Sequence, residues 1–101
     1  MSNSAIADNN SLNSLGRIKV EMYSTALCPY CTRARLLFEK KGIEVTEFRI
    51  DKDASLRNEM ERRCNRSSVP QIFIGNQHIG GFDELARLEF GEELDSILGL
   101  E

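Results

Sequence analysis

The sequence contains no tryptophan, one histidine and three cysteines among its 101 residues. A structural zinc site needs four ligands. Beyond one closely spaced cysteine pair, the chain offers only Cys64 and His78, each isolated in the sequence. We therefore expect no metal site. An odd number of cysteines also fits a reducing cytoplasm better than a secreted disulfide framework.

Long apolar runs and a strong charge of either sign are absent as well. No stretch is long enough to span a membrane, and the N-terminus lacks the basic cluster and apolar run of a signal peptide. We therefore expect a cytoplasmic chain that does not contact membranes. The formal net charge of −3 argues against generic nucleic-acid binding.

The composition is typical of one globular domain, with 41% hydrophobic and 29% charged residues. Residues 1–15 are rich in Ser and Asn and show no sustained hydrophobic period, which is typical of a flexible tail. We expect the folded domain over residues 16–101, and a monomer in solution.

The most informative stretch is Cys28-Pro29-Tyr30-Cys31. An alternating segment precedes it, and apolar residues at helical spacing follow it until Gly42. The pair therefore falls at a strand-to-helix junction, with Cys28 near the N-cap and Pro29 at the first helical position, where a missing N–H is harmless. Free N–H groups and the partial positive charge of a helix N-terminus favour a thiolate, which is the nucleophilic form of cysteine.

Cys31 lies one helical turn after Cys28 and is within reach for a disulfide. A purely structural disulfide is one alternative, but the loop it closes is so short that its entropic benefit is small, and nothing indicates an oxidising compartment. The other alternative is that the two cysteines form half of a zinc site, but the chain lacks the remaining ligands. A redox-active dithiol is the favoured interpretation.

Hydrophobic periodicity and turn residues predict the other elements. Strands are predicted at residues 17–23, 44–50, 71–74 and 77–79, the last two joined by a tight turn at Gly75-Asn76. Helices are predicted at residues 28–41, from a cap at Asp51 or Asp53 to about residue 63, and from about Asp83 onward with an interruption at Gly91. The order βαβαββα predicts an α/β fold with a four-stranded mixed sheet and helices on both faces.

Three segments together resemble the glutaredoxin family, and most of all its small bacterial dithiol members. They are Cys-Pro-Tyr-Cys after the first strand, Ser68-Val69-Pro70 before the hairpin, and Gly80-Gly81-Phe82-Asp83 after it. The similarity covers roughly residues 17–101. Thioredoxins share the cysteine spacing, but they typically carry Trp-Cys-Gly-Pro-Cys, and this chain has no tryptophan. The resemblance implies a thioredoxin-like fold.

The resemblance also implies a glutathione site beside the cysteine pair. Pro70 takes the place of the family's cis proline, which turns the backbone N–H and C=O of Val69 outward to pair with the cysteinyl unit. N–H groups of Phe82 and Asp83 suit the γ-glutamyl carboxylate, and the Asp83 side chain suits the ammonium. The simpler readings are a strand-edge proline and a plain N-cap aspartate. The implied glutathione-binding set is Tyr30, Arg66, Ser68, Val69, Pro70, Gly81, Phe82 and Asp83.

One position departs from the family pattern. Many members carry a lysine three residues before the first cysteine, where it pairs with the glycine carboxylate of glutathione, and this chain has Thr25 there and Leu27 directly before Cys28. We predict Arg66 as the substitute, because arginine grips a carboxylate in a bidentate fork. Arg33 is a further candidate.

The function that the resemblance implies is glutathione-dependent thiol–disulfide oxidoreduction on protein disulfides and glutathione mixed disulfides, through Cys28 and Cys31. Glutathione reductase with NADPH is the implied upstream system. One alternative is a dedicated electron donor to a single enzyme such as ribonucleotide reductase. Another is a [2Fe–2S] cluster held between two monomers, which Pro29 disfavours because members that bind one commonly carry a smaller residue there. Cys64 is predicted to be inert and His78 to be a surface residue.

Overall fold

The computed structural model describes residues 18–100, so the predicted tail over residues 1–15 lies outside the described part. Its strands are β1 (Val20–Ser24), β2 (Val45–Arg49), β3 (Gln71–Ile74) and β4 (Gln77–Gly80). Its helices are α1 (Pro29–Lys40), α2 (Ala54–Cys64), α3 (Phe82–Phe90) and α4 (Leu94–Ile97). None of these helices combines the length and apolar character needed to cross a bilayer.

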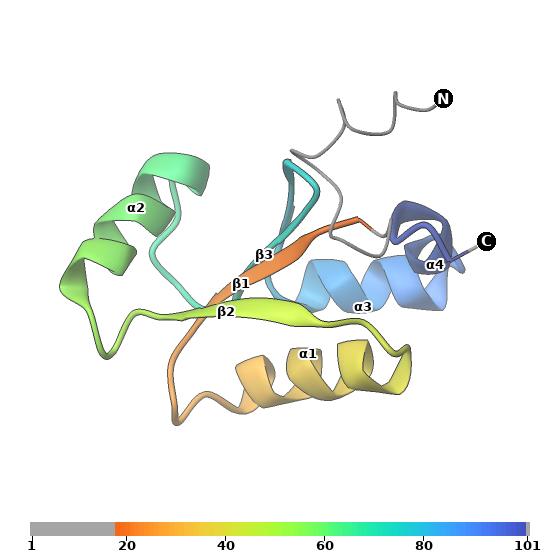
Figure 1. The fold of residues 1–101 in the computed structure, drawn as a ribbon, viewed down its shortest axis with the longest axis horizontal. Helices are drawn as coiled ribbons and strands as arrows, with labels where there is room; N and C mark the ends of the chain where they lie inside the picture. The colour runs from red at the N-terminus through yellow and green to blue at the C-terminus, as the bar shows by residue number, and fades with distance from the viewer. Residues whose placement is uncertain (1–17, 101) are drawn as a thin grey trace, which may run out of the picture.

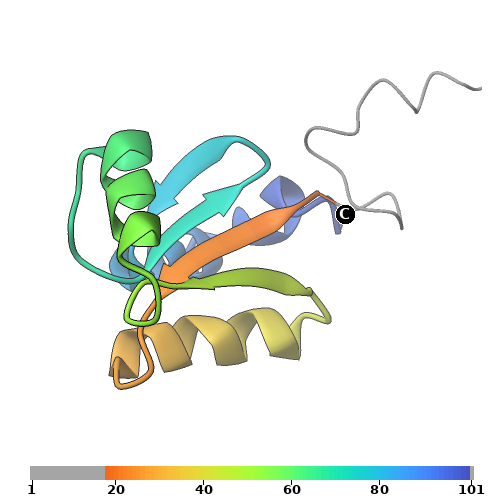
Figure 2. The same ribbon diagram turned by 60° about the vertical axis from the view of Figure 1, so that its left-hand side comes forward.

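The four strands form one sheet in the order β2-β1-β3-β4. β1 and β2 are parallel, whereas β1 pairs with β3 and β3 with β4 in antiparallel fashion. Helices α1 and α3 cover one face of the sheet and α2 covers the other (Figures 1 and 2). The predicted mixed four-stranded sheet with helices on both faces is confirmed.

Each face of the sheet has its own apolar core, because successive strand residues point to opposite faces. In β1, Val20 and Met22 pack with Phe38 of α1 and Leu85 of α3. Tyr23, the next residue of β1, points to the opposite face and packs there with Met60 of α2 and Phe73 of β3. The two cores fix α1 and α2 on opposite sides of the strand that leads to the cysteine pair.

Several element boundaries differ by one to three residues from the sequence-based prediction, and two of these differences lie next to the site. The first strand extends to Ser24 because Ser24 still pairs with Arg49 of β2. The last helix is not capped by Asp83. Gly81 is the N-cap, since its carbonyl accepts the first helical hydrogen bond from Leu85 N–H at 3.1 Å. The predicted interruption at Gly91 is confirmed, because Gly91 is the C-cap of α3 and α4 follows separately.

The two candidates for the cap of α2 are resolved in favour of Asp53. Its carboxylate accepts the Ser55 N–H at 3.0 Å, as an N-cap does. Asp51 instead forms a two-pronged ion pair with Arg49 and accepts the Ala26 N–H at 3.2 Å. Asp51 therefore ties down the loop that leads to the cysteine pair.

Strand pairing brings the three sequence motifs to one edge of the sheet. Tyr23, near the end of β1, lies opposite Gln71 at the start of β3, and Ile72 lies opposite Gly80 at the end of β4. The cysteine loop after β1, the Ser-Val-Pro segment before β3 and the glycine pair at the end of β4 therefore meet. This edge holds the candidate site.

Candidate active site

Cys28 occupies the N-cap of α1, as predicted. Its backbone is extended, and its sulfur accepts the N–H of Cys31 at 3.1 Å, so the side chain caps the first turn. Pro29 follows at the first helical position. The Cys28 sulfur is therefore a hydrogen-bond acceptor at the N-terminus of α1.

Cys31 faces the interior of the protein and is fully buried. Burial, together with the neighbouring Cys28 sulfur, raises the pKa of the Cys31 thiol to about 12. The structure holds both cysteines as free thiols. The two sulfurs therefore differ in kind: one is partly exposed and hydrogen-bonded at a helix terminus, and the other is a buried neutral thiol.

The Val69–Pro70 segment lies against Cys28. The peptide bond between them is cis, and Pro70 is buried directly before β3. The Cys28 thiol points at the Val69 carbonyl, with the sulfur 3.8 Å from the oxygen. The backbone of Val69 is thus beside the sulfur that would carry a bound cysteinyl group.

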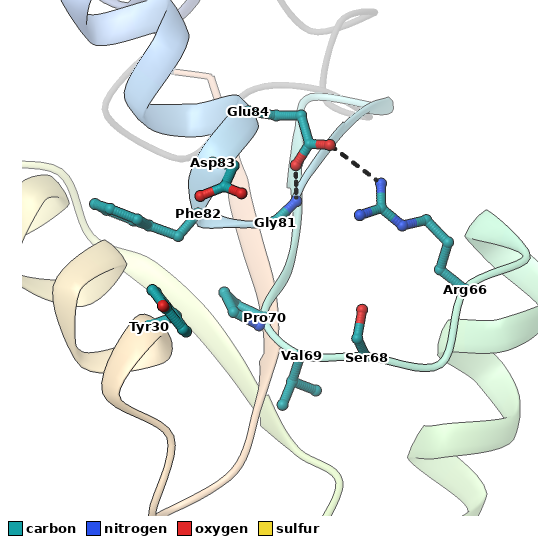
Figure 3. A pocket seen from close by; sticks show the side chains of 9 residues that line it. All are labelled: Tyr30, Arg66, Ser68, Val69, Pro70, Gly81, Phe82, Asp83 and Glu84. Carbon is teal, nitrogen blue, oxygen red and sulfur yellow. Dashed lines mark hydrogen bonds and ion pairs between the residues drawn. The ribbon is translucent and has the colours of Figure 1, made fainter.

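A pocket of about 270 Å³ opens next to this contact. It is lined by side chains from α1, the loop between α2 and β3, and the start of α3 (Figure 3). The lining consists of Tyr30, Arg66, Ser68, Val69, Pro70, Gly81, Phe82, Asp83 and Glu84. All eight residues predicted to hold glutathione are therefore brought together, and Glu84 is the addition. Cys28 is not among the lining residues.

Arg66 lies across the pocket from Tyr30, on the rim opposite the cysteine helix (Figure 3). Its Nη1 is 3.6 Å from Glu84 Oε2. Arg33, the second predicted cation, does not line the pocket. Its guanidinium lies 5.1 Å from the centre of the Tyr30 ring, and that ring lies 6.3 Å from the ring of Phe82. Arg33 therefore packs on the Tyr30 ring, outside the residues that line the pocket.

The two glycines, Gly80 and Gly81, lie against other groups of the protein. A side-chain carbon on Gly80 would lie 2.8 Å from the carboxyl group of Glu84. Gly80 also has a φ of +117°, a conformation that favours glycine. Gly81 approaches the Pro70 carbonyl. The glycines make room for Glu84 and for the segment before β3.

Sequence reasoning missed the support beneath Ser68. Gln71 is fully buried, and its Nε2 donates to the Ser68 carbonyl at 3.0 Å. Its Oε1 lies 2.8 Å from Nε2 of His78, which must therefore be the donor. His78 was predicted to be a surface residue, but it is half-buried, and burial lowers the pKa of its ring. His78 and Gln71 hold the Ser68 end of the pocket.

The inert role of Cys64 stays a prediction, because its sulfur lies 3.8 Å from the carbonyl oxygen of the pocket residue Arg66. Cys64 is the last residue of α2, and its thiol donates to the Met60 carbonyl at 3.2 Å, as a helical side chain often does. It packs with the core under α2. Within residues 18–100, no group of three or more His, Cys, Asp or Glu side chains is placed to hold a metal ion.

Known proteins with the same arrangement identify the family. Residues 20–79 match the sequence model of the glutaredoxin family. The chain is 48% identical over 79 residues to Glutaredoxin 3 of Escherichia coli K12, covering 78% of this chain and 95% of the relative. It is 44% identical over 79 residues to Glutaredoxin of Pseudomonas aeruginosa, covering 78% and 94% respectively.

Solved structures agree with these sequence matches. The solution structure of glutaredoxin from Brucella melitensis superposes with a TM-score of 0.73 at 43% identity, covering 83% of this chain and 91% of that one. The crystal structure of a buckwheat glutaredoxin–glutathione complex superposes with a TM-score of 0.76 at 25% identity, covering 95% and 88%. The chain belongs to the glutaredoxin family and has its thioredoxin-like fold and thiol–disulfide oxidoreductase activity.

Proposed function

We propose that this protein reduces glutathione mixed disulfides and protein disulfides at the expense of glutathione, in the cytoplasm and as a monomer. The observation that carries the proposal is the position of the Cys28 sulfur. It lies at the N-terminus of α1, accepts a backbone N–H at 3.1 Å, and faces the Val69 carbonyl at the edge of the pocket.

Cys28 is the attacking group in this proposal. Its thiolate attacks the glutathione sulfur of a mixed disulfide, so a bond forms between Cys28 and glutathione while the substrate leaves as a thiolate. A second glutathione thiolate then attacks the sulfur of the bound glutathione, which releases glutathione disulfide and restores the Cys28 thiolate. Glutathione reductase and NADPH would return the disulfide to two thiols.

Cys31 has the resolving role when the substrate is a protein disulfide. After Cys28 has attacked, Cys31 attacks the Cys28 sulfur, the second substrate thiolate leaves, and the protein retains a Cys28–Cys31 disulfide that glutathione reduces. Two electrons pass from the dithiol to the substrate in each cycle. Ribonucleotide reductase is one candidate acceptor for this route, because the family resemblance suggested that this protein donates electrons to such an enzyme.

The pocket is proposed to hold the glutathione moiety in an extended conformation. The Val69 backbone would pair with the cysteinyl unit, and Tyr30 would flank it. The N–H groups of Phe82 and Asp83 would bind the γ-glutamyl carboxylate, with the Asp83 carboxylate facing the ammonium. The glutathione complex of the buckwheat relative supports this assignment, because the two folds superpose.

The direct test is reduction of a glutathionylated peptide by glutathione, coupled to glutathione reductase and followed by NADPH absorbance. We expect turnover that depends on both glutathione and the protein. Equal turnover with dithiothreitol alone and none with glutathione would show that the pocket serves another thiol and would reject the proposal.

Arg66 is expected to bind the glycine carboxylate of glutathione in place of the lysine replaced by Thr25. Arg66→Ala should lower kcat/KM for a glutathionylated peptide roughly two- to fivefold, because the contact is exposed and screened by solvent. Arg62→Ala is the control. It removes an exposed arginine from the last turn of α2, four residues before Arg66, and should leave kcat/KM unchanged. Equal effects of the two variants would mean that Arg66 contributes only general positive charge.

Thr25→Lys is the converse test. It places a cation at the position where many relatives have one, and it should raise kcat/KM for the same peptide by a similar factor. The gain should shrink as salt concentration rises, since screening weakens an exposed pair. A gain that is independent of salt would indicate a change in loop structure and not a new contact with the ligand.

A further inference from the structure

Glu84 is the one pocket-lining residue that the sequence motifs did not predict. Its side chain comes from the first turn of α3 and lies between Gly81 and Arg66 (Figure 3). One carboxylate oxygen, Oε1, accepts the Gly81 N–H at 2.7 Å, and the other, Oε2, lies 3.6 Å from Arg66 Nη1. A single carboxylate therefore joins the end of β4 to the arginine across the pocket.

The two partners of Glu84 hold it very differently. The Gly81 N–H fixes the carboxylate by a short hydrogen bond. Glycine at position 80 leaves space for this carboxylate, because a side chain there would clash with it. Arg66 lies beyond hydrogen-bond distance, and its side chain is 42% exposed. The negative charge is therefore fixed by the backbone, whereas the arginine is held to it by charge attraction without a hydrogen bond.

Glu84 is negatively charged at the neutral pH at which a cysteine thiolate reacts. The hydrogen bond from the Gly81 N–H is the main cause that lowers the pKa of Glu84 below its usual value, and the positive charges of Arg66 and Arg87 act in the same direction. In the described part of the chain, Arg66 is the only cationic side chain lining the pocket, against two carboxylates, Asp83 and Glu84.

We propose that Glu84 determines specificity by competing with the C-terminal carboxylate of the bound tripeptide for Arg66. The proposal rests on the glutathione-binding function proposed above. A ligand carboxylate must take the arginine from a fixed anion and then lie beside that anion. The pocket therefore gains less from a free glycine carboxylate than Arg66 alone would give, and it discriminates only weakly between glutathione and cysteinyl peptides whose C-terminus is blocked.

Glu84→Gln separates this role from helix capping. The glutamine carbonyl can still accept the Gly81 N–H, so the N-terminus of α3 is retained while the charge is removed. The substrates are one peptide carrying glutathione in mixed disulfide and the same peptide carrying glutathione ethyl-esterified at glycine. The measured quantity is kcat/KM for the first divided by kcat/KM for the second.

We expect this ratio to rise roughly two- to fivefold in Glu84→Gln, the range for release of an exposed ion pair. The rise should come from KM, with kcat unchanged, and it should disappear in the Arg66→Ala background. Glu89→Gln is the matched control, because it removes the same charge from the far end of α3, where Glu89 pairs with Lys41 at 2.8 Å. Its ratio should equal that of the parent protein.

Other outcomes overturn the inference. An unchanged or lower ratio would mean that Glu84 only caps the helix or aims Arg66 at the ligand. Equal gains for both substrates would mean that its charge repels the whole ligand without acting through Arg66. If the parent protein turns over neither substrate, the proposed glutathione function itself has failed, and this result is distinct from an active parent with an insensitive ratio.

Discussion

Cys28→Ser is expected to abolish reduction of every disulfide substrate, by roughly 10³-fold or more, because it removes the attacking nucleophile. No second thiol can take its place. Cys31 is fully buried with a pKa of about 12, and Cys64, partly buried at the end of α2, packs against the core on the other face of the sheet. The measurement is NADPH consumption with a glutathionylated peptide and with a protein disulfide.

Cys31→Ser is expected to affect the reduction of these two substrates differently. The hydrogen bond that reaches the Cys28 sulfur comes from the backbone N–H of residue 31, so serine retains it. Reduction of the glutathionylated peptide should therefore persist, while reduction of protein disulfides that need two thiols should be lost. Cys64→Ser should retain both activities. Loss of both in Cys31→Ser would show that the one-thiol route does not operate here.

Most of the fold was predictable from sequence because local signals agreed with each other. The alternating segment before Cys28, the proline at the first helical position and the Gly75-Asn76 turn each specify a local conformation, and all three are found in the structure. Boundaries that depend on pairing were less accurate. Ser24 belongs to β1 because it has a partner in β2, and its own sequence context does not reveal that partner.

The pocket residues were predictable through a family resemblance, but their interactions were not. Glu84 stands three residues after the N-cap Gly81, the spacing of a capping box, so the helix signal was available. Its approach to Arg66 depends on how the loop after α2 folds over the strands. The bond between Gln71 and His78 likewise depends on the pairing of β3 with β4. Such contacts follow from tertiary structure and have no local signature.

The second large effect concerns the order in which the two thiols react. Burial is the main cause of the raised pKa of Cys31, and the hydrogen bond and charge of the Cys28 sulfur add to it. When Cys28 enters a mixed disulfide it loses its charge, so that second contribution is removed and the Cys31 thiol becomes more acidic. The proton is therefore held on Cys31 most firmly before Cys28 has reacted, and less firmly afterwards.

This order should be visible in alkylation by iodoacetamide, followed by mass spectrometry in the Cys64→Ser background. With a pKa of about 12, Cys31 at neutral pH should react on the order of 10³-fold more slowly than a free cysteine of pKa about 8.5. Because only the thiolate reacts, its rate should rise about tenfold per pH unit and continue to rise well above pH 9. In Cys28→Ser, which removes the sulfur but not the burial, Cys31 should react faster than in the parent protein and still more slowly than a free cysteine. A plateau in the Cys31 rate near pH 9 in the parent protein would contradict this account, because it would mean that neither burial nor Cys28 holds the proton on Cys31.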